Sequence, residues 1–283
     1  MRWFLLVLIL CASQSFAETF LWRISKDANA LFIGGTIHVL RKSDYPLPAA
    51  FDDAFKKSTK VIFETNVAES EDPAFALQMM QRLMYAEGRN LKDDLSSDVY
   101  QQLEKFSAER GLPLAMFEKM RPPLVVLTLT MMELQRLGIS DVGVDKYYFQ
   151  RAQAEQKPVG ELETGEQQLD FISHLGEGRE DDLVRYSLND MRQVEATMQK
   201  MTLAWRNGDQ AEMASLSLDE MRREFPGIYQ QLLVNRNNNW LPKLESMLHD
   251  PGAELVLVGA LHLVGEDGLL NLLRKRGYHI EQW

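Results

Sequence analysis

The stretch ALFIGGTIHV, residues 30–39, has a counterpart in LVLVGALHLV, residues 255–264, near the other end of the chain. Each is an apolar run that contains Gly-x-x-His, which places His38 and His262 at equivalent positions. Runs of this composition predict buried β-strands. In open α/β sheets, ligands bind beyond the carboxyl ends of the strands. The two stretches therefore predict two strands of one sheet, with both histidines at its ligand-binding edge.

A glycine lies three residues before each histidine and lets the backbone pass close to a neighbour or a bound group, because it has no Cβ. A single histidine at a strand end is more often a hydrogen-bonded structural residue than a ligand. The repetition of the motif favours a shared site for His38 and His262.

The N-terminal third predicts the start of an α/β layer. Residues 20–24 and 30–39 are expected to form a hairpin, and a helix over 49–58 leads to a strand over 60–65. A helix between two strands is typical of a βαβ crossover, so residues 30–39 and 60–65 are expected to form a parallel pair.

The rest of the chain completes this layer and adds helices to it. The C-terminal third predicts a strand over 254–259, a helix over 265–276 and an edge strand over 278–281. Residues 73–137 and 166–247 have helical spacing, separated by a short strand over 158–163. The expected fold is α/β, with a mixed sheet from the N- and C-terminal thirds and a large, mostly helical middle insertion.

The N-terminus has the order of a secretory signal. Arg2 gives a positive start, residues 3–12 are almost entirely apolar, and Ser15-Phe16-Ala17 offers small residues for cleavage. The apolar run is too short for a permanent membrane anchor. We therefore expect residues 1–17 to be removed, leaving a single domain over 18–283 that is exported, periplasmic or secreted, without a membrane anchor.

The single cysteine, Cys11, allows a competing interpretation as a lipoprotein. A lipid-attachment motif normally has a small residue before the cysteine, whereas here it is Leu10. Removal of Cys11 with the signal would leave no cysteine, which excludes disulfides, thiolate metal ligands and a cysteine nucleophile.

Charge and missing motifs narrow the functional classes. The chain has 31 basic and 41 acidic residues, a net charge of −10, and no basic stripe with interleaved aromatics, which argues against nucleic-acid binding. It contains no Gly-x-Ser-x-Gly, Walker loop, His-Glu-x-x-His or dinucleotide fingerprint. This argues against serine hydrolases of that type, nucleotide enzymes, zincins and Rossmann dehydrogenases.

Glu64 ends the strand over 60–65 and is expected at the same sheet edge as His38. Such an acidic residue is often only a helix cap or a solvated loop residue. Together with His38 and His262, however, it forms the ligand set of a divalent metal that keeps a position open for water. A metal bound there would lower the pKa of that water and polarise a carbonyl, which supports hydrolysis.

Two further residues are candidates for the same site. Glu163 follows the strand over 158–163 and is a candidate general base, fourth ligand or carboxylate that orients a ligand histidine, with Glu161 as the alternative. Arg236 lies in Asn-Arg-Asn-Asn-Asn, inside an expected helix over 227–248. The asparagines indicate either a helix kink or an Arg236 that points into the site to hold a carboxylate or an oxyanion.

These motifs, taken in order, resemble the TraB/GumN family, which includes the animal TIKI metalloproteases. The likeness covers most of the chain after residue 17 and rests on Gly35-Thr36-Ile37-His38, Phe63-Glu64-Thr65, Glu161-Leu162-Glu163-Thr164 with Gln167, Asn235-Arg236-Asn237 with Trp240, and Gly259-Ala260-Leu261-His262. The resemblance implies an erythromycin-esterase/ChaN-like fold. By analogy with TIKI it also implies a peptidase site supported by manganese or cobalt, with zinc as a further candidate.

The resulting hypothesis is an exported, metal-dependent hydrolase, with a peptide or small molecule as substrate and a peptidase as the main expectation. The metal is assigned to His38, Glu64 and His262, with Glu64, Glu163 and Arg236 in catalysis. The alternative is a non-catalytic protein of the same fold that sequesters a peptide or small ligand. Replacing either histidine with alanine is expected to abolish activity and to leave folding largely intact.

Overall fold

The computed structural model describes residues 19–70, 72–139 and 142–283 and contains a six-stranded mixed sheet. The expected signal segment, residues 1–17, lies outside the described residues. The strand order is β4-β3-β5-β2-β1-β6. The strands are β1 Leu21–Lys26, β2 Asn29–Thr36, β3 Lys60–Phe63, β4 Val159–Glu161, β5 Glu254–Gly259 and β6 His279–Gln282. Strands β4, β3, β5 and β2 are parallel, whereas β1 pairs antiparallel with both β2 and β6.

The expected hairpin of β1 and β2 is confirmed, and so is the edge position of β6. The expected pairing of β2 with β3 is wrong in one respect, because β5 lies between them. The side chains of residues 255–258 in β5 are at most 1% exposed. A strand that is apolar on both faces is most stable in the middle of a sheet. The C-terminal strand β5 therefore lies between the two N-terminal strands β2 and β3.

Helices make up most of the rest of the described chain. They are α1 Ala49–Lys57, α2 Val67–Ser70, α3 Pro73–Leu83, α4 Ser97–Glu109, α5 Pro122–Arg136, α6 Val144–Ala154, α7 Gly165–His174, α8 Glu180–Arg206, α9 Gln210–Glu224, α10 Pro226–Tyr229, α11 Asn235–Met247 and α12 Leu269–Lys275. Short 3₁₀ turns occupy Lys42–Asp44, Leu91–Asp93, Leu114–Met116 and Ala260–His262. This confirms an α/β fold with a helical middle region.

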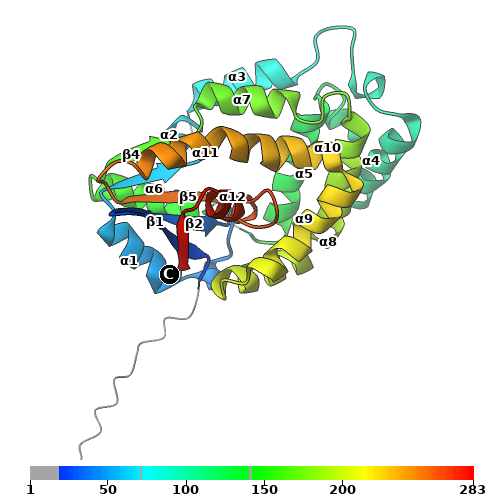
Figure 1. Cartoon of the computed structure of the whole chain (residues 1–283). Helices are drawn as coiled ribbons and strands as arrows, with labels where there is room; N and C mark the ends of the chain where they lie inside the picture. The colour runs from blue at the N-terminus through cyan, green and yellow to red at the C-terminus, as the bar shows by residue number, and fades with distance from the viewer. Residues whose placement is uncertain (1–18, 71, 140–141) are drawn as a thin grey trace, which may run out of the picture.

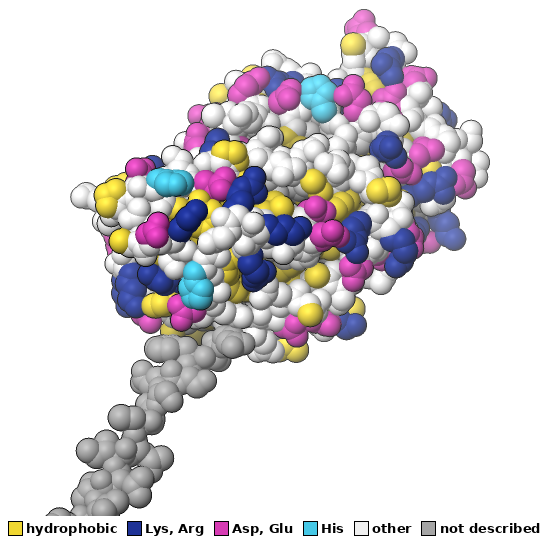
Figure 2. All heavy atoms as spheres, viewed as in Figure 1, with side chains coloured by type: hydrophobic (Ala, Val, Ile, Leu, Met, Phe, Trp, Pro, Cys, Tyr) yellow, Lys and Arg dark blue, Asp and Glu magenta, His cyan; other side chains and the backbone are white. Residues whose placement is uncertain are grey.

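The helical middle region gathers beside the sheet, and α11 crosses back over it towards β5 (Figure 1). A large apolar core surrounds the sheet, and a second cluster fills the space between α4, α5 and α8. Within the described ranges, no helix combines the length and apolarity needed to cross a membrane. On the face drawn in Figure 2, lysine and arginine side chains are mixed with acidic and apolar ones, so this face has no field of one sign.

The segment expected as a helix over 227–248 is helical from α10 through α11. A π-helical turn, Gln230–Val234, joins the two and widens the helix before Arg236. The asparagines do not break this helix, and the side chain of Asn237 is buried and donates to the carbonyls of His262 and Asp267. Single π turns are frequent at functional sites because they change which face a side chain occupies. This turn directly precedes α11, which carries Arg236.

Candidate active site

The candidate site lies where four parallel strands end. Thr36 of β2 pairs with Gly259 of β5, and Phe63 of β3 pairs with both Leu257 of β5 and Glu161 of β4. Parallel strands in this register end at the same edge of the sheet. The residues that follow them, His38, Glu64, Glu163 and His262, are therefore brought to one edge.

Glu64 is held by two donors. Its Oε1 accepts the backbone N–H of Gly259 at 2.6 Å, and its Oε2 accepts from Nη2 of Arg236 at 2.7 Å. Burial alone would raise the pKa of the Glu64 carboxyl. The charge of Arg236, with smaller contributions from His262, His38 and the Gly259 N–H, outweighs burial and holds that pKa well below its usual range. Glu64 is therefore a buried carboxylate anion.

Gly259 marks the point where the side chains converge. A Cβ placed there would lie 3.2 Å from Oε1 of Glu64, 3.4 Å from Nε2 of His38 and 3.6 Å from Cδ2 of His262. A side chain at this position would therefore contact all three residues and crowd the Glu64 carboxylate slightly.

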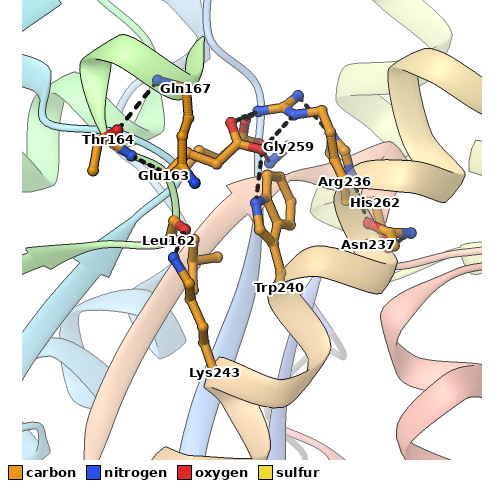
Figure 3. A network of polar contacts seen from close by, with 11 residues as sticks. Leu162, Glu163, Thr164, Gln167, Arg236, Asn237, Trp240, Lys243, Gly259 and His262 are labelled. Carbon is orange, nitrogen blue, oxygen red and sulfur yellow. Dashed lines mark hydrogen bonds and ion pairs between the residues drawn. The ribbon is translucent and has the colours of Figure 1, made fainter. Parts of the chain in front are cut away.

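Arg236 contacts two carboxylates and one histidine, and Figure 3 shows it beside Glu163 and His262. Its Nε and Nη2 donate to the two oxygens of Glu163 at 3.0 and 2.9 Å, Nη2 also donates to Glu64, and Nη1 lies 3.2 Å from Nε2 of His262. Its side chain is only 12% exposed and lies over the rings of Phe171 and Trp240. A buried guanidinium with two carboxylate partners is rigidly oriented.

Glu163 is the carboxylate that reaches the cluster from β4. Besides Arg236, it accepts from Nε1 of Trp240 at 2.9 Å. The backbone before it is also fixed, because Lys243 of α11 donates its Nζ to the carbonyl of Leu162. Of the two alternatives left open by the sequence, Glu161 and Glu163, the structure places Glu163 against Arg236.

His262 has one defined tautomer. Asn237 uses its amide nitrogen on two carbonyls, so its Oδ1, 2.7 Å from Nδ1 of His262, accepts the Nδ1 proton. Nε2 of His262 is then the acceptor for Arg236. Burial lowers the pKa of His262 to about 3, which keeps the ring neutral. The residue is 5% exposed and its ring lies 4.4 Å from that of Trp240, so replacement is expected to disturb packing, contrary to the sequence expectation.

His38 differs from His262 because 58% of its side chain is exposed. Its Nδ1 lies 3.0 Å from Oδ1 of Asp145 in the first turn of α6. The Asp145 carboxylate raises the pKa of His38 to about 9. Asp145 is 107 residues away in the sequence, and only the fold brings it to His38.

Gly143 explains how α6 comes so close. Val144 donates its N–H to the carbonyl of Ile37 at 3.0 Å, which joins the start of α6 to the segment that carries His38. A Cβ at Gly143 would lie 2.2 Å from the carbonyl carbon and oxygen of His38. Backbone atoms cannot move away as a flexible side chain does, so this contact requires glycine.

The three expected metal ligands do not form a complete ligand set in this arrangement. Nε2 of His262 has a single lone pair, which accepts from Arg236, and Oε2 of Glu64 also accepts from Arg236. In the part of the chain that the structure describes, no three histidine, cysteine, aspartate or glutamate side chains are arranged to hold a metal ion. The donor types suit a divalent metal, but the guanidinium occupies the position that a cation would need.

Two pockets meet at Arg236. One, of about 600 Å³, is the more polar of the two and has walls that include Glu163, Asp170 and Lys243 beside Phe171 and Leu175. The other, of about 340 Å³, is bordered by His38 and His262 and is mainly apolar. Arg236 is the residue that lines both pockets, so a ligand extending from one to the other would pass its guanidinium.

A profile of the TraB/PrgY/gumN family matches residues 20–282. The chain belongs to the TraB/PrgY/gumN family. The family predicted from the sequence motifs is thus confirmed. The site of this TraB/PrgY/gumN chain is built from those same motifs, which contain His38, Glu64, Glu163, Arg236 and His262.

Two relatives illustrate how far the likeness extends. The chain is 28% identical over 244 residues to "Uncharacterized protein YbaP" of Escherichia coli, which covers 85% of this chain and 86% of YbaP. It is 24% identical over 330 aligned positions to "Metalloprotease TIKI1" of Homo sapiens, which covers 95% of this chain but only 62% of TIKI1. No solved structure gives a significant match. The relation to the TIKI metalloproteases is therefore distant.

Proposed function

We propose that this chain is an exported hydrolase that cleaves peptide bonds at the edge carrying His38, Glu64 and Arg236. The observation that carries the proposal is that a half-exposed histidine, bonded to Asp145, and a buried guanidinium line the same pocket. Nε2 of His38 faces the Gly259 position at which Glu64 and His262 also converge. The relation to the TIKI metalloproteases supports peptides as the substrate class.

Each residue has a role that follows from its contacts. His38 exchanges a proton with water or with the leaving group through Nε2, while Asp145 fixes the ring and stabilises the imidazolium. Arg236 uses four of its five N–H donors on Glu64, Glu163 and His262, which leaves one N–H on Nη1 for the oxyanion of the substrate carbonyl. Glu64 and Glu163 orient that guanidinium.

The proposal includes a divalent metal, which the experiment below tests. The family analogy favours manganese or cobalt, and zinc is a further candidate. The expected ligands remain His38, Glu64 and His262. Because Arg236 holds the lone pair of His262, we expect the metal and the contact between Arg236 and His262 to exclude each other. The erythromycin-esterase/ChaN-like form of the fold is likewise part of the proposal.

Hydrolysis of a peptide library tests the proposal. The purified chain is incubated with the library after chelation and then with manganese, cobalt or zinc, and the products are identified by mass spectrometry. We expect cleavage that is lost in His38→Gln, with the metal arms showing whether an added ion is required. His249→Gln is the matched control, because His249 is exposed in the turn after α11 and its Nδ1 contacts the carbonyl of Glu245. No cleavage in any arm would end the hydrolase proposal.

A non-catalytic, sequestering protein is the second candidate. The observation that favours it is the saturation of the buried cluster, in which Glu64, Glu163 and His262 all bond to Arg236. Such a protein would bind peptides from the library without releasing products, and its binding would survive His38→Gln.

Export is proposed from the N-terminal sequence. Mass spectrometry of the protein isolated from its host is expected to show a free N-terminus at Glu18. An intact Met1 or a lipid on Cys11 would contradict this.

A further inference from the structure

The apolar pocket beside His38 has no role in the chemistry described above. Its walls come from three helical elements and the two strand ends: Met198 and Met201 of α8, Met221 of α9, Leu232 and Leu233 of the π turn, and Ile37 after β2. His38 and Arg236 border it, and His262 lies in its wall. A ligand group in this pocket would therefore lie directly beside the reacting atoms.

We propose that this pocket binds one large aliphatic or methionine side chain of a peptide, next to the bond that is cleaved. The position of the side chain next to a cleaved bond rests on the proposed function. The preference of the pocket for apolar side chains is independent of cleavage. The volume of about 340 Å³ is at the lower end of the range for ligand pockets. It suits a side chain and not a whole folded partner.

The chemistry of the lining selects against charged side chains. Arg236 at the border is already paired with Glu64 and Glu163, so a lysine or arginine side chain would leave water for apolar walls without gaining a free carboxylate partner. The carboxylates of Glu64 and Glu163 are committed to Arg236 and do not offer a partner. An acidic side chain would lose water against apolar walls, where most donors of Arg236 are already engaged.

The walls also suit side chains of differing shape. Three of them are methionines, whose flexible thioethers adapt to different apolar groups. Met198 and Met201 are half-buried on α8, so their side chains have room to rearrange. We therefore expect leucine, methionine and phenylalanine to be accepted and alanine to be bound more weakly.

The polar pocket on the other side of Arg236 sets the orientation of the peptide. Its walls include Asp170, Asn239 and Lys243, which suit polar groups and backbone amides. An extended peptide that crosses from the apolar to the polar pocket brings one carbonyl over the guanidinium of Arg236. The side chain preceding or following that carbonyl is the one that enters the apolar pocket.

The test uses an acetylated, amidated hexapeptide of glycine and alanine, and six versions with leucine at one position. Affinities for the whole chain are measured by calorimetry in the His38→Gln variant, so that cleavage does not interfere. We expect leucine at one position to tighten binding at least about tenfold, as expected for added methylenes in an apolar pocket. Lysine at that position is expected to give no gain.

Two variants locate the effect. Leu232→Trp fills the pocket and is expected to remove the gain from leucine, whereas Leu203→Trp, at a position of α8 that is 61% exposed and outside the pocket, keeps it. Met198→Lys is the second pocket variant and is also expected to remove the gain from leucine. Its folded state is expected to be kept, because the charged end of a side chain at this half-buried position can reach water.

The outcomes separate this inference from the proposed function. Leucine selectivity that is lost in Leu232→Trp or Met198→Lys supports the pocket, even if the wild-type chain cleaves none of the peptides, in which case only the hydrolase proposal falls. Cleavage by the wild-type chain without any preference for leucine, or selectivity that survives in both folded pocket variants, overturns the inference and leaves the hydrolase proposal standing.

Discussion

Replacing Arg236 with methionine is expected to lower the free energy of unfolding by about 3–5 kcal/mol at neutral pH. The guanidinium is 12% exposed and is the shared partner of Glu64 and Glu163, whose side chains are 11% and 10% exposed. Methionine fills much of the same space but leaves two buried carboxylates without their cation. Removing one partner of a buried ion pair is costly because the remaining charge is desolvated without compensation.

The loss of stability is expected to depend on pH. In the wild-type chain, Arg236 depresses the pKa of Glu64, so this carboxylate stabilises the fold above its unfolded pKa and stops doing so as pH falls through its folded pKa. Without Arg236, burial raises that pKa, and the folded state is destabilised as pH rises above the unfolded value. The difference between the two proteins is therefore largest at neutral pH and shrinks towards pH 4, as urea unfolding across this range would measure.

Arg222→Met is the matched control. Arg222 pairs with Glu266 at 3.2 Å on the surface, where both side chains are at least half exposed, so its loss is expected to change stability by less than about 1 kcal/mol. A pH-independent effect of Arg236→Met, or one no larger than the control, would contradict the buried network.

The same variant tests the relation between Arg236 and metal. Removing the guanidinium frees the lone pair on Nε2 of His262 and one oxygen of Glu64. We expect manganese affinity, measured by equilibrium dialysis, to rise at least about tenfold in Arg236→Met. Tight manganese binding by the wild-type chain that is lost in the variant would show instead that Arg236 supports the metal.

Replacing His38 with glutamine is expected to reduce kcat/KM for a cleaved peptide by about 10² to 10⁴, the usual contribution of a general acid or base. Stability is expected to change little, because the side chain is 58% exposed. His262→Gln is expected to lose activity and stability together, since His262 is 5% exposed and contacts Asn237, Arg236 and Trp240. Both variants are thus expected to lose activity, and unfolding measurements distinguish them because only His262→Gln is expected to lose stability.

Asp145→Asn examines the pH dependence of the same residue. Asp145 raises the pKa of His38 to about 9, so its removal is expected to move the limb of the kcat/KM profile that reports His38 to lower pH. His249→Gln serves as the control, because His249 is exposed, its Nδ1 contacts the carbonyl of Glu245, and it lines neither pocket at Arg236. An unshifted profile in folded Asp145→Asn would mean that His38 does not carry the titrating proton.

The strands that carry the site, and the sheet edge at which they end, could be predicted from the sequence alone. The apolar runs before Gly35 and Gly259 predict strands because few other structures bury such runs, and strands of one parallel sheet must end at a common edge. This argument anticipated that His38, Glu64, Glu163 and His262 would meet, and motif order identified the family. Both inferences depend on patterns among residues that are close together in the sequence.

The tertiary structure alone decided which partner each of these residues has. The position of β5 between β2 and β3, the approach of Asp145 to His38 past Gly143, and the contacts of Arg236 with Glu64 and Glu163 all depend on packing between distant segments. No local pattern encodes them, because an aspartate in a first helical turn is favourable with or without a histidine nearby. For the same reason, the sequence predicted His262 as a metal ligand, whereas in the folded chain its Nε2 accepts a hydrogen bond from Arg236.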